Sequence, residues 1–238
     1  MKGSAGASLA TKSSNLYPPR KIWILGAGHF GFLAAQRLSR RHPEASFLVV
    51  DVKVKKLQRI QETFNLPIHV EEAISFVGKS SLPDDVWIIP AVPFHVAFLW
   101  ILDQLNKTGQ AVAVPIPVPG MVELLIPNPY RATGGTLYAS YATFLCPDSC
   151  NEPDEMCTHT REARRGNLFE DLRRIAVPGF KVIVVQSRQL APGVGGYSGL
   201  DLKGTLSDVT KAEGAFLIAT SCRCHGVLDG LRWKEGGR

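Results

Sequence analysis

Apolar and polar residues alternate along residues 21–115 in blocks that predict strands and helices in turn. Short apolar runs suit buried strands, and apolar residues three and four positions apart suit helices. Strands are expected at residues 22–25, 47–51, 68–70, 86–89 and 111–114. The helices between them are expected to bury Gly31, Ala34, Ala35 and Leu38, then Leu57, Ile60 and Phe64, and then Phe94, Ala97, Phe98, Ile101 and Leu105. This alternation predicts an α/β fold with a Rossmann-like, doubly wound, mainly parallel sheet.

The first expected strand runs directly into a glycine-rich turn, Gly26-Ala27-Gly28-His29-Phe30-Gly31. In a G-x-G-x-x-G motif the first glycine allows the turn, the second lets the backbone approach a pyrophosphate, and the third lets the helix pack on the sheet. Free amides at the start of the helix then point at the anion. The motif predicts a dinucleotide site, with a purely structural glycine turn as the alternative.

The second expected strand ends at Asp51, twenty positions after Gly31. A carboxylate at this point binds the ribose hydroxyls and repels a 2′-phosphate, which favours NAD over NADP. Lys53, Lys55 and Lys56 weaken that preference, because they could neutralise a phosphate. The fourth strand ends at a proline, so the chain leaves the sheet at the edge where such folds bind ligands. Residues expected at the dinucleotide are Gly26, Gly28, His29, Phe30, Gly31, Asp51, Val52, Pro90, Ala91 and Val92.

The second half of the chain predicts another β-α-β unit with weaker signals. The expected elements are a strand-like run at 136–144, a short helix capped by Asn167, a strand at 181–186, a glycine-rich loop at 193–199, a helix with Leu202, Leu206 and Val209 inward, and a strand at 215–219. The backbone amides of the 193–199 loop could cradle an anion, and ordinary turn glycines are the alternative. This unit either extends the first sheet or stands apart. We therefore expect a flexible leader at 1–20, a dinucleotide-binding Rossmann domain at 21–125 and a cysteine-containing α/β portion at 126–238.

Residues 21–115 resemble the NAD-binding N-terminal domain of TrkA-type potassium-uptake regulators, the RCK fold, and more loosely saccharopine-type dehydrogenases. The resemblance is carried by Gly26–Gly31, Asp51 and the strand region 84–89. It implies an NAD-binding regulatory or sensor protein in which occupancy shifts a conformation or a homo-oligomer. Glu71-Glu72 departs from the Gly-Asp pair that is usual in the family. From Tyr130 onward no family is matched.

All five cysteines lie in the second half, in two groups. Cys146, Cys150 and Cys157 form C-x3-C-x6-C in a proline-rich, acidic loop, and Cys222 and Cys224 follow the last expected strand. Disulfides are disfavoured in a cytosolic protein, so a metal centre is the better interpretation, with unligated or redox thiols as the alternative. Zinc and a [4Fe–4S] cluster both accept four thiolates, and they are almost equally favoured. We expect three ligands from the first group and the fourth from Cys222 or Cys224.

Charge and hydropathy narrow the range of partners. The net charge of +6 is spread over short clusters with acids interleaved, which indicates solvated helix faces and no nucleic-acid surface. The apolar window 86–102 contains two prolines and a histidine, so it predicts a strand and a helix with no direct membrane insertion. The first twenty residues lack an apolar core for a signal peptide. These features predict a cytoplasmic protein, and the dinucleotide predicted from the glycine motif remains the expected partner.

Three functions remain open from the sequence. The first is an NAD-binding regulator or sensor of the RCK type, and the second is an NAD-dependent oxidoreductase with a cysteine-bound metal centre. The third is a binding module with structural zinc. No Ser-His-Asp pattern, H-E-x-x-H motif or Lys-Tyr dehydrogenase pair is present, so His95, His159 and His225 are the acid/base candidates. His95 is expected either to face the nicotinamide or to be a partly exposed residue at a helix start.

Overall fold

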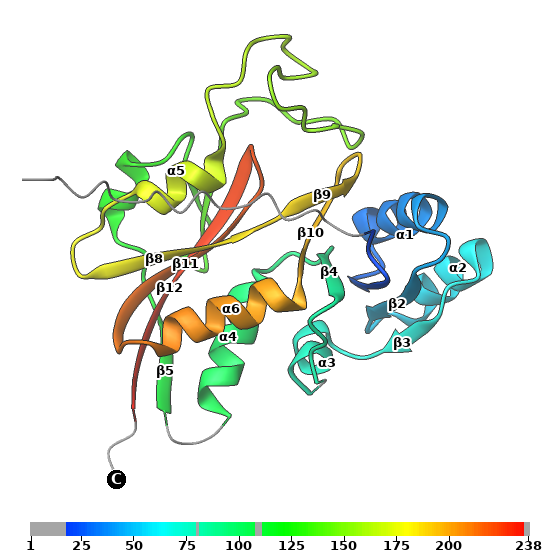
Figure 1. Cartoon of the computed structure of the whole chain (residues 1–238), viewed down its shortest axis with the longest axis horizontal. Helices are drawn as coiled ribbons and strands as arrows, with labels where there is room; N and C mark the ends of the chain where they lie inside the picture. The colour runs from blue at the N-terminus through cyan, green and yellow to red at the C-terminus, as the bar shows by residue number, and fades with distance from the viewer. Residues whose placement is uncertain (1–17, 80, 108–110, 236–238) are drawn as a thin grey trace, which may run out of the picture.

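The computed structural model describes residues 18–79, 81–107 and 111–235, which form two β-sheets with helices packed against them (Figure 1). Both sheets mix parallel and antiparallel strands, so the fold is mixed α/β. Apart from 18–20, the expected leader lies outside the described residues. The helices of the described part are α1 (His29–Arg41), α2 (Val54–Phe64), α3 (Ala73–Lys79), α4 (Val96–Asn106), α5 (Leu168–Arg174) and α6 (Gly199–Thr210), with a 3₁₀ turn η1 (Gly120–Leu124).

The first sheet has the strand order β3-β2-β1-β4-β10-β9. Its strands are β1 (Lys21–Leu25), β2 (Ser46–Asp51), β3 (Ile68–Val70), β4 (Val86–Pro90), β9 (Arg188–Ala191) and β10 (Val194–Ser198). The first four run parallel, and β10 joins β4 in the antiparallel direction. The predicted strands up to residue 89 are confirmed. So is the inner face of α1, which buries Gly31, Ala34, Ala35 and Leu38.

The second sheet has the order β6-β7-β12-β11-β8, and β5 also pairs with β12. Its strands are β5 (Ala111–Ile116), β6 (Tyr130–Arg131), β7 (Leu137–Ser140), β8 (Phe180–Gln186), β11 (Gly214–Ser221) and β12 (His225–Glu235). β8 and β11 run parallel, whereas β12 is antiparallel to β5, β7 and β11. The predicted strand at 136–144 is shorter than expected, because only residues 137–140 pair.

The expected fifth strand of the first sheet is instead part of the second sheet, so that prediction was wrong. β5 pairs with β12, from Ala111 opposite Glu235 to Ile116 opposite Gly230. Ala113 is buried, while Val112 and Val114 are 49% and 44% exposed. A strand with one open face suits an antiparallel sheet, because parallel strands are usually covered on both faces. The second half therefore does not simply prolong the parallel sheet.

The glycine-rich segment 193–199, expected as a loop, is mostly strand β10. A Cβ on Gly196 would lie 2.5 Å from the carbonyl oxygen of Ile88, on the neighbouring strand β4. The glycines therefore allow two backbones to approach closely, which is one of the reasons for glycine inside a strand. Tyr197 and Ser198 pair with β4 residues, so this backbone is engaged in the sheet.

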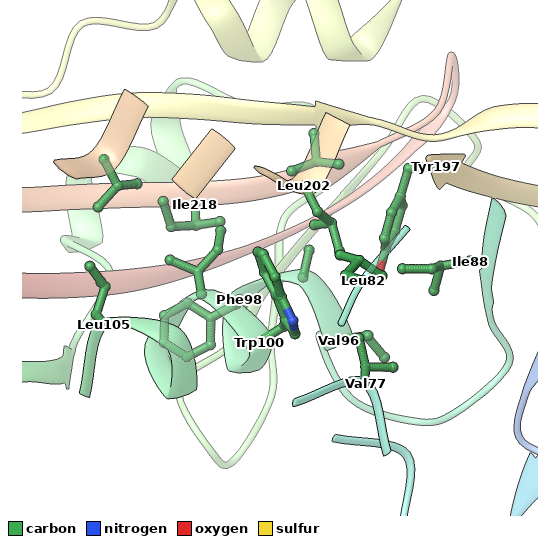
Figure 2. Packing of buried hydrophobic residues seen from close by; sticks show 14 of the residues in the cluster. Val77, Leu82, Ile88, Val96, Phe98, Trp100, Leu105, Tyr197, Leu202 and Ile218 are labelled. Carbon is green, nitrogen blue, oxygen red and sulfur yellow. The ribbon is translucent and has the colours of Figure 1, made fainter. Parts of the chain in front are cut away.

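One hydrophobic cluster joins the two sheets (Figure 2). It combines Ile88 of β4 and Tyr197 of β10 with Ile218 of β11, and α4 and α6 contribute Trp100 and Leu202. Residues on β11 alternate between faces, so Leu217 and Ala219 enter a separate cluster under α5. Burial on both faces makes β11 an inner strand of the protein. The apolar window 86–102 is β4 followed by the start of α4, and none of the helices in the described ranges combines the length and apolarity needed to cross a membrane.

His95 is buried, so the prediction of a partly exposed residue at a helix start was wrong. The residue is the N-cap of α4, and it is only 6% exposed. Its Nδ1 is 2.9 Å from Asp229 Oδ2, and its Nε2 is 2.9 Å from Thr220 Oγ1. Thr136 Oγ1 donates to the other oxygen of Asp229 at 2.8 Å. This buried network fastens the start of α4 to β11 and β12, and it lacks contact with the cavity described below.

We expect His95→Ala to lower the free energy of unfolding by about 3 kcal/mol, because Asp229 and Thr220 would lose a buried hydrogen-bonding partner. Urea denaturation measures the change. His69→Ala is a suitable control, since His69 is half exposed and contacts Glu71 at the edge of the first sheet. An equal loss in both variants would contradict the role given to the buried network.

Candidate functional site

The three glycines of the turn after β1 have different surroundings. Gly26 has φ of +104°, and a Cβ there would lie 2.4 Å from the carbonyl oxygen of Ala91. A Cβ on Gly31 would lie 1.9 Å from the carbonyl oxygen of Gly26. Gly28, in contrast, has no atom within 4 Å of the position of its Cβ. The protein itself requires the first and third glycines, whereas the second faces open space.

Asp51 lies at the end of β2 and contacts this turn. Its Oδ2 accepts a hydrogen bond from the Ala27 amide at 2.6 Å, and its Oδ1 accepts one from the Lys53 amide at 2.8 Å. The carboxylate is partly exposed, and Val52 beside it is 57% exposed. The structure therefore brings the predicted acid and the glycine-rich turn together.

The turn lies where the order of the parallel strands reverses. From β1 the chain proceeds to β2 and β3 on one side, and then returns to β4 on the other side. Open parallel sheets bind ligands outside the carboxyl ends of the strands at such a position. The Ala91 amide donates to the carbonyl of Leu25 at 2.8 Å, and Val92 also lies beside Gly26. The residues after β4 are therefore neighbours of the turn, as the sequence predicts.

A cavity of about 680 Å³ adjoins this edge of the sheet. Phe30 of α1 and Pro90 of β4 line it, together with all five cysteines and His225. Two cysteine groups about 65 residues apart thus meet around one space. His159 is absent from the lining and stacks on Phe144, with ring centroids 4.4 Å apart.

The first cysteine group is held against the first sheet. Arg37 of α1 donates to the carbonyl oxygens of Asp148 and Pro192 at 2.6 and 2.7 Å. His29 Nε2 is 2.8 Å from Asp148 Oδ2, and the Gly193 amide donates to the Cys150 carbonyl at 2.8 Å. The loop that carries the first three cysteines is the long segment between β7 and α5, at the top of Figure 1. Its position therefore depends on α1 and on the β9–β10 hairpin.

The second group is held by short contacts within and around the turn between β11 and β12. Cys222 Sγ accepts hydrogen bonds from the backbone amides of Cys224 and His225 at 3.5 and 3.4 Å. The Arg223 amide donates to Glu152 Oε1 at 2.7 Å, which joins this turn to the first cysteine loop. Arg164 Nη1 donates to Cys224 Sγ at 2.6 Å. The imidazole of His225 lies between the groups, with Nε2 3.5 Å from the sulfur of Cys146.

Burial and neighbouring charge make the thiols unequal. Burial raises the pKa of the Cys146 thiol, and the charges of nearby cysteines raise it further. Burial also raises the pKa of Cys224, although the hydrogen bond and charge of Arg164 oppose that effect. A hydrogen bond from the Thr160 amide lowers the pKa of Cys157. Of the thiols with a shifted pKa, Cys157 is thus the one that most readily forms a thiolate.

The thiols surround the cavity and do not converge on one point. Within the described ranges, no three His, Cys, Asp or Glu side chains form a ready site for a single metal ion. The metal ligands therefore stay a prediction. Sequence reasoning missed Arg164 and Glu152, because nothing in their spacing connects them with Cys224 or Cys222.

The fold and the site define an α/β protein with a glycine-rich turn and a cysteine-lined cavity. Residues 97–234 match the AF_1314_C family, described as "Uncharacterized protein, C-terminal domain", and the chain belongs to this family. The match includes all five cysteines and begins after the glycine-rich turn. An Archaeoglobus fulgidus protein described as uncharacterized is 26% identical over 225 residues, which cover 88% of this chain and 98% of that protein.

The surroundings of the glycines predict different effects of adding one methyl group. We expect Gly31→Ala to lower the free energy of unfolding by about 1 to 3 kcal/mol or more, because its Cβ meets backbone atoms. Gly28→Ala should cost less than about 1 kcal/mol, since its Cβ enters open space at a helix N-cap. Thermal unfolding without ligand compares the two variants. Equal stability of the two proteins would contradict the close contact at Gly31.

Proposed function

We propose that this protein is an NAD(H)-dependent oxidoreductase in which the bound dinucleotide lies beside a cysteine-held metal centre. The observation that carries the proposal is the shared cavity. Phe30 and Pro90 border the predicted dinucleotide site, and they line the same space as the five cysteines. A ligand that extends from the glycine-rich turn past these two residues would therefore reach the thiols.

The proposal treats β1 to β4 as a Rossmann-like unit of the kind found in the NAD-binding domain of TrkA-type regulators. The parallel order β3-β2-β1-β4 supports this assignment, because it equals the first part of the order in dinucleotide-binding sheets. The glycine contacts support it as well, since only Gly28 leaves room for a pyrophosphate. Asp51 follows β2 and contacts the turn through the Ala27 amide, and an acid at this point of a dinucleotide-binding sheet would bind the adenosine ribose, which supports NAD over NADP.

The metal centre is assigned to the cysteines because several partly buried thiols that line one cavity would gain stability from a cation. Zinc would polarise a bound substrate, and an iron–sulfur cluster would exchange electrons. His225 is the acid/base candidate at this site, since it contacts Cys146 and burial lowers its pKa, which leaves the imidazole neutral and able to accept a proton. The free cysteines are suited to the reducing cytoplasm, which is the proposed location.

A sensor of the RCK type is the second candidate, and the contacts of Asp148 favour it. His29 and Arg37 project from the helix that follows the glycine-rich turn, and both contact this residue of the cysteine loop. Binding of a dinucleotide at the start of α1 could therefore shift the loop, a homo-oligomer or a partner. A sensor binds NAD and NADH with different affinities and without turnover, because equal affinities cannot drive a switch.

We expect Asp51→Ala to weaken NAD binding by about 1 to 2 kcal/mol, or roughly 5- to 30-fold, because a hydrogen bond to a charged group is lost. Discrimination against NADP should decrease at the same time. Isothermal titration calorimetry with both dinucleotides measures these changes. Asp51→Asn separates the effect of the negative charge from the effect on the turn. Its amide oxygen can still accept a hydrogen bond from the backbone N–H of Ala27 or Lys53.

Asp85→Ala is the matched control for this measurement, because Asp85 is an exposed acid outside the proposed site. It should leave the affinity for NAD and the preference for NAD over NADP unchanged. If Asp51→Ala behaved like this control, the ribose contact would be assigned to the wrong residue.

The shared cavity also predicts that NAD protects the cysteines. In metal-free protein, we expect a maleimide to label Cys157 before Cys146 or Cys224, because its pKa is the lowered one. Saturating NAD should slow this labelling several-fold, as measured by peptide mass spectrometry over time.

Gly28→Val provides the control, since its side chain occupies the open space that the pyrophosphate needs. Labelling of this variant should be fast with and without NAD. Protection that persisted in Gly28→Val would show that NAD acts elsewhere. Normal NAD affinity without protection in the unchanged protein would separate the dinucleotide site from the cysteine cavity.

A further inference from the structure

Strand β5 lies at an edge of the second sheet. Within the described part of the chain, β5 has a strand partner only on its β12 side. The outer side of an edge strand presents backbone N–H and C=O groups that can pair with a strand of another molecule. The sequence of β5, Ala-Val-Ala-Val-Pro-Ile, carries no charge that would oppose such pairing. An uncharged edge of this kind is open to self-association unless another group covers it.

The end of α4 lies beside β5 (Figure 1), and Asn106 is the last residue of that helix. Its Oδ1 accepts a hydrogen bond from the Ala113 amide at 2.9 Å, and its Nδ2 donates to the Ala113 carbonyl at 2.9 Å. The same Nδ2 donates to the carbonyl of Leu102, in the last turn of α4, at 3.0 Å. A carboxamide offers an N–H donor and a C=O acceptor, as a peptide group does. Asn106 therefore gives Ala113 the two bonds that a neighbouring strand would give.

The pairing with β12 explains why Ala113 is the residue that is covered. In an antiparallel pair, residues that bond to the partner strand alternate with residues whose N–H and C=O point away from it. Ala113 lies opposite Trp233, and its bonds to Asn106 show that its backbone groups point outward. Pro115, two positions further along, also points outward and has no N–H to donate. Asn106 and Pro115 thus remove the outward donors at positions 113 and 115.

We propose that Asn106 closes the edge of β5 against strand pairing with a second copy of this chain. Without the carboxamide, two β5 strands would pair antiparallel about a two-fold axis at Ala113, because the outward N–H and C=O groups of this residue would bond to those of its copy. The same register places Val112 of one copy beside Val114 of the other. Both valines are exposed in the single chain, so the pairing would also bury apolar surface. These residues do not line the cysteine cavity, and the inference is independent of the proposed function.

Asn106→Ala is the variant that tests the proposal. It should form dimers at a concentration roughly tenfold or more below that of any dimer of the unchanged protein, because two backbone hydrogen bonds become available across the two-fold axis. Sedimentation velocity over a series of concentrations measures the change, and circular dichroism verifies that the fold is retained. Gln104→Ala is the matched control, since the carboxamide of Gln104 donates to Asp103 on the same helix. The control should sediment like the unchanged protein.

Val112→Lys tests whether the dimers form through β5. Added to Asn106→Ala, it should restore the monomer, because a lysine on an edge strand opposes pairing. Val112 is half exposed, so the fold should tolerate this substitution. Dimers that persisted in the double variant would place the contact elsewhere and overturn the proposal. A monomeric Asn106→Ala protein with the native fold would overturn it as well.

Hydrogen exchange of the Ala113 amide tests the cover in the unchanged protein, even if the Asn106→Ala variant does not fold. This amide should exchange slowly at every protein concentration, because Asn106 holds its hydrogen within the same molecule. Protection that appeared only at high concentration would show that a second copy, and not Asn106, covers the edge. A dimer of the unchanged protein that Val112→Lys dissociates would contradict the proposal in the same way.

Discussion

The pairing of β10 with β4 is the contact on which the rest of the site depends. It brings a hairpin from the second half of the chain onto the parallel strands of the first half. Gly196 makes this possible, because any side chain there would collide with the backbone of Ile88. The end of the same hairpin carries Gly193, which holds the cysteine loop through the carbonyl of Cys150. This backbone contact, together with the bonds from Arg37 and His29 of α1, sets the distance between the glycine-rich turn and the thiols.

The hydrophobic core and the His95 network make that placement rigid. α4 and α6 pack between the two sheets, so that residues of β4, β10 and β11 share one cluster. Moving one sheet away from this cluster would expose apolar side chains of both sheets to water, which is unfavourable. Apolar packing alone does not fix orientation. The hydrogen bonds from His95 to Asp229 and Thr220 do so, because they hold the start of α4 against β12 and β11.

The sequence predicts well those features that depend on local periodicity. The four parallel strands, the buried face of α1 and the neighbours of Gly26 follow from apolar spacing and from one glycine motif. Strand β12 was missed, because Gly226, Asp229 and Gly230 resemble a turn. In the structure Gly230 lets β5 approach, and a Cβ there would lie 2.3 Å from the carbonyl oxygen of Ile116. Glycine that serves a close strand contact cannot be distinguished by composition from glycine that ends a strand.

The candidate site was predictable only in its separate parts. The two cysteine groups are evident in the sequence, but their meeting depends on β11, β12 and the hairpin at Gly193. Arg164 and Glu152 act through that meeting, so no local pattern reveals them. His95 shows a different limit of sequence reasoning. A histidine after β4 could serve a ligand site or a structural network, and only its contact with the distant Asp229 shows the structural network.

The electrostatics of the cavity connect its structure to its proposed use. Burial raises the pKa of Cys146, Cys222 and Cys224, so these thiols are protonated near neutral pH when no metal ion is bound. The proposed metal centre requires thiolates, so its loading would release protons and its affinity would increase with pH. Arg164 reduces the cost of this charging at Cys224, while Glu152 increases it at Cys222. Burial is the largest cause of both pKa shifts, and the two side chains that hold the loops together change them in opposite directions.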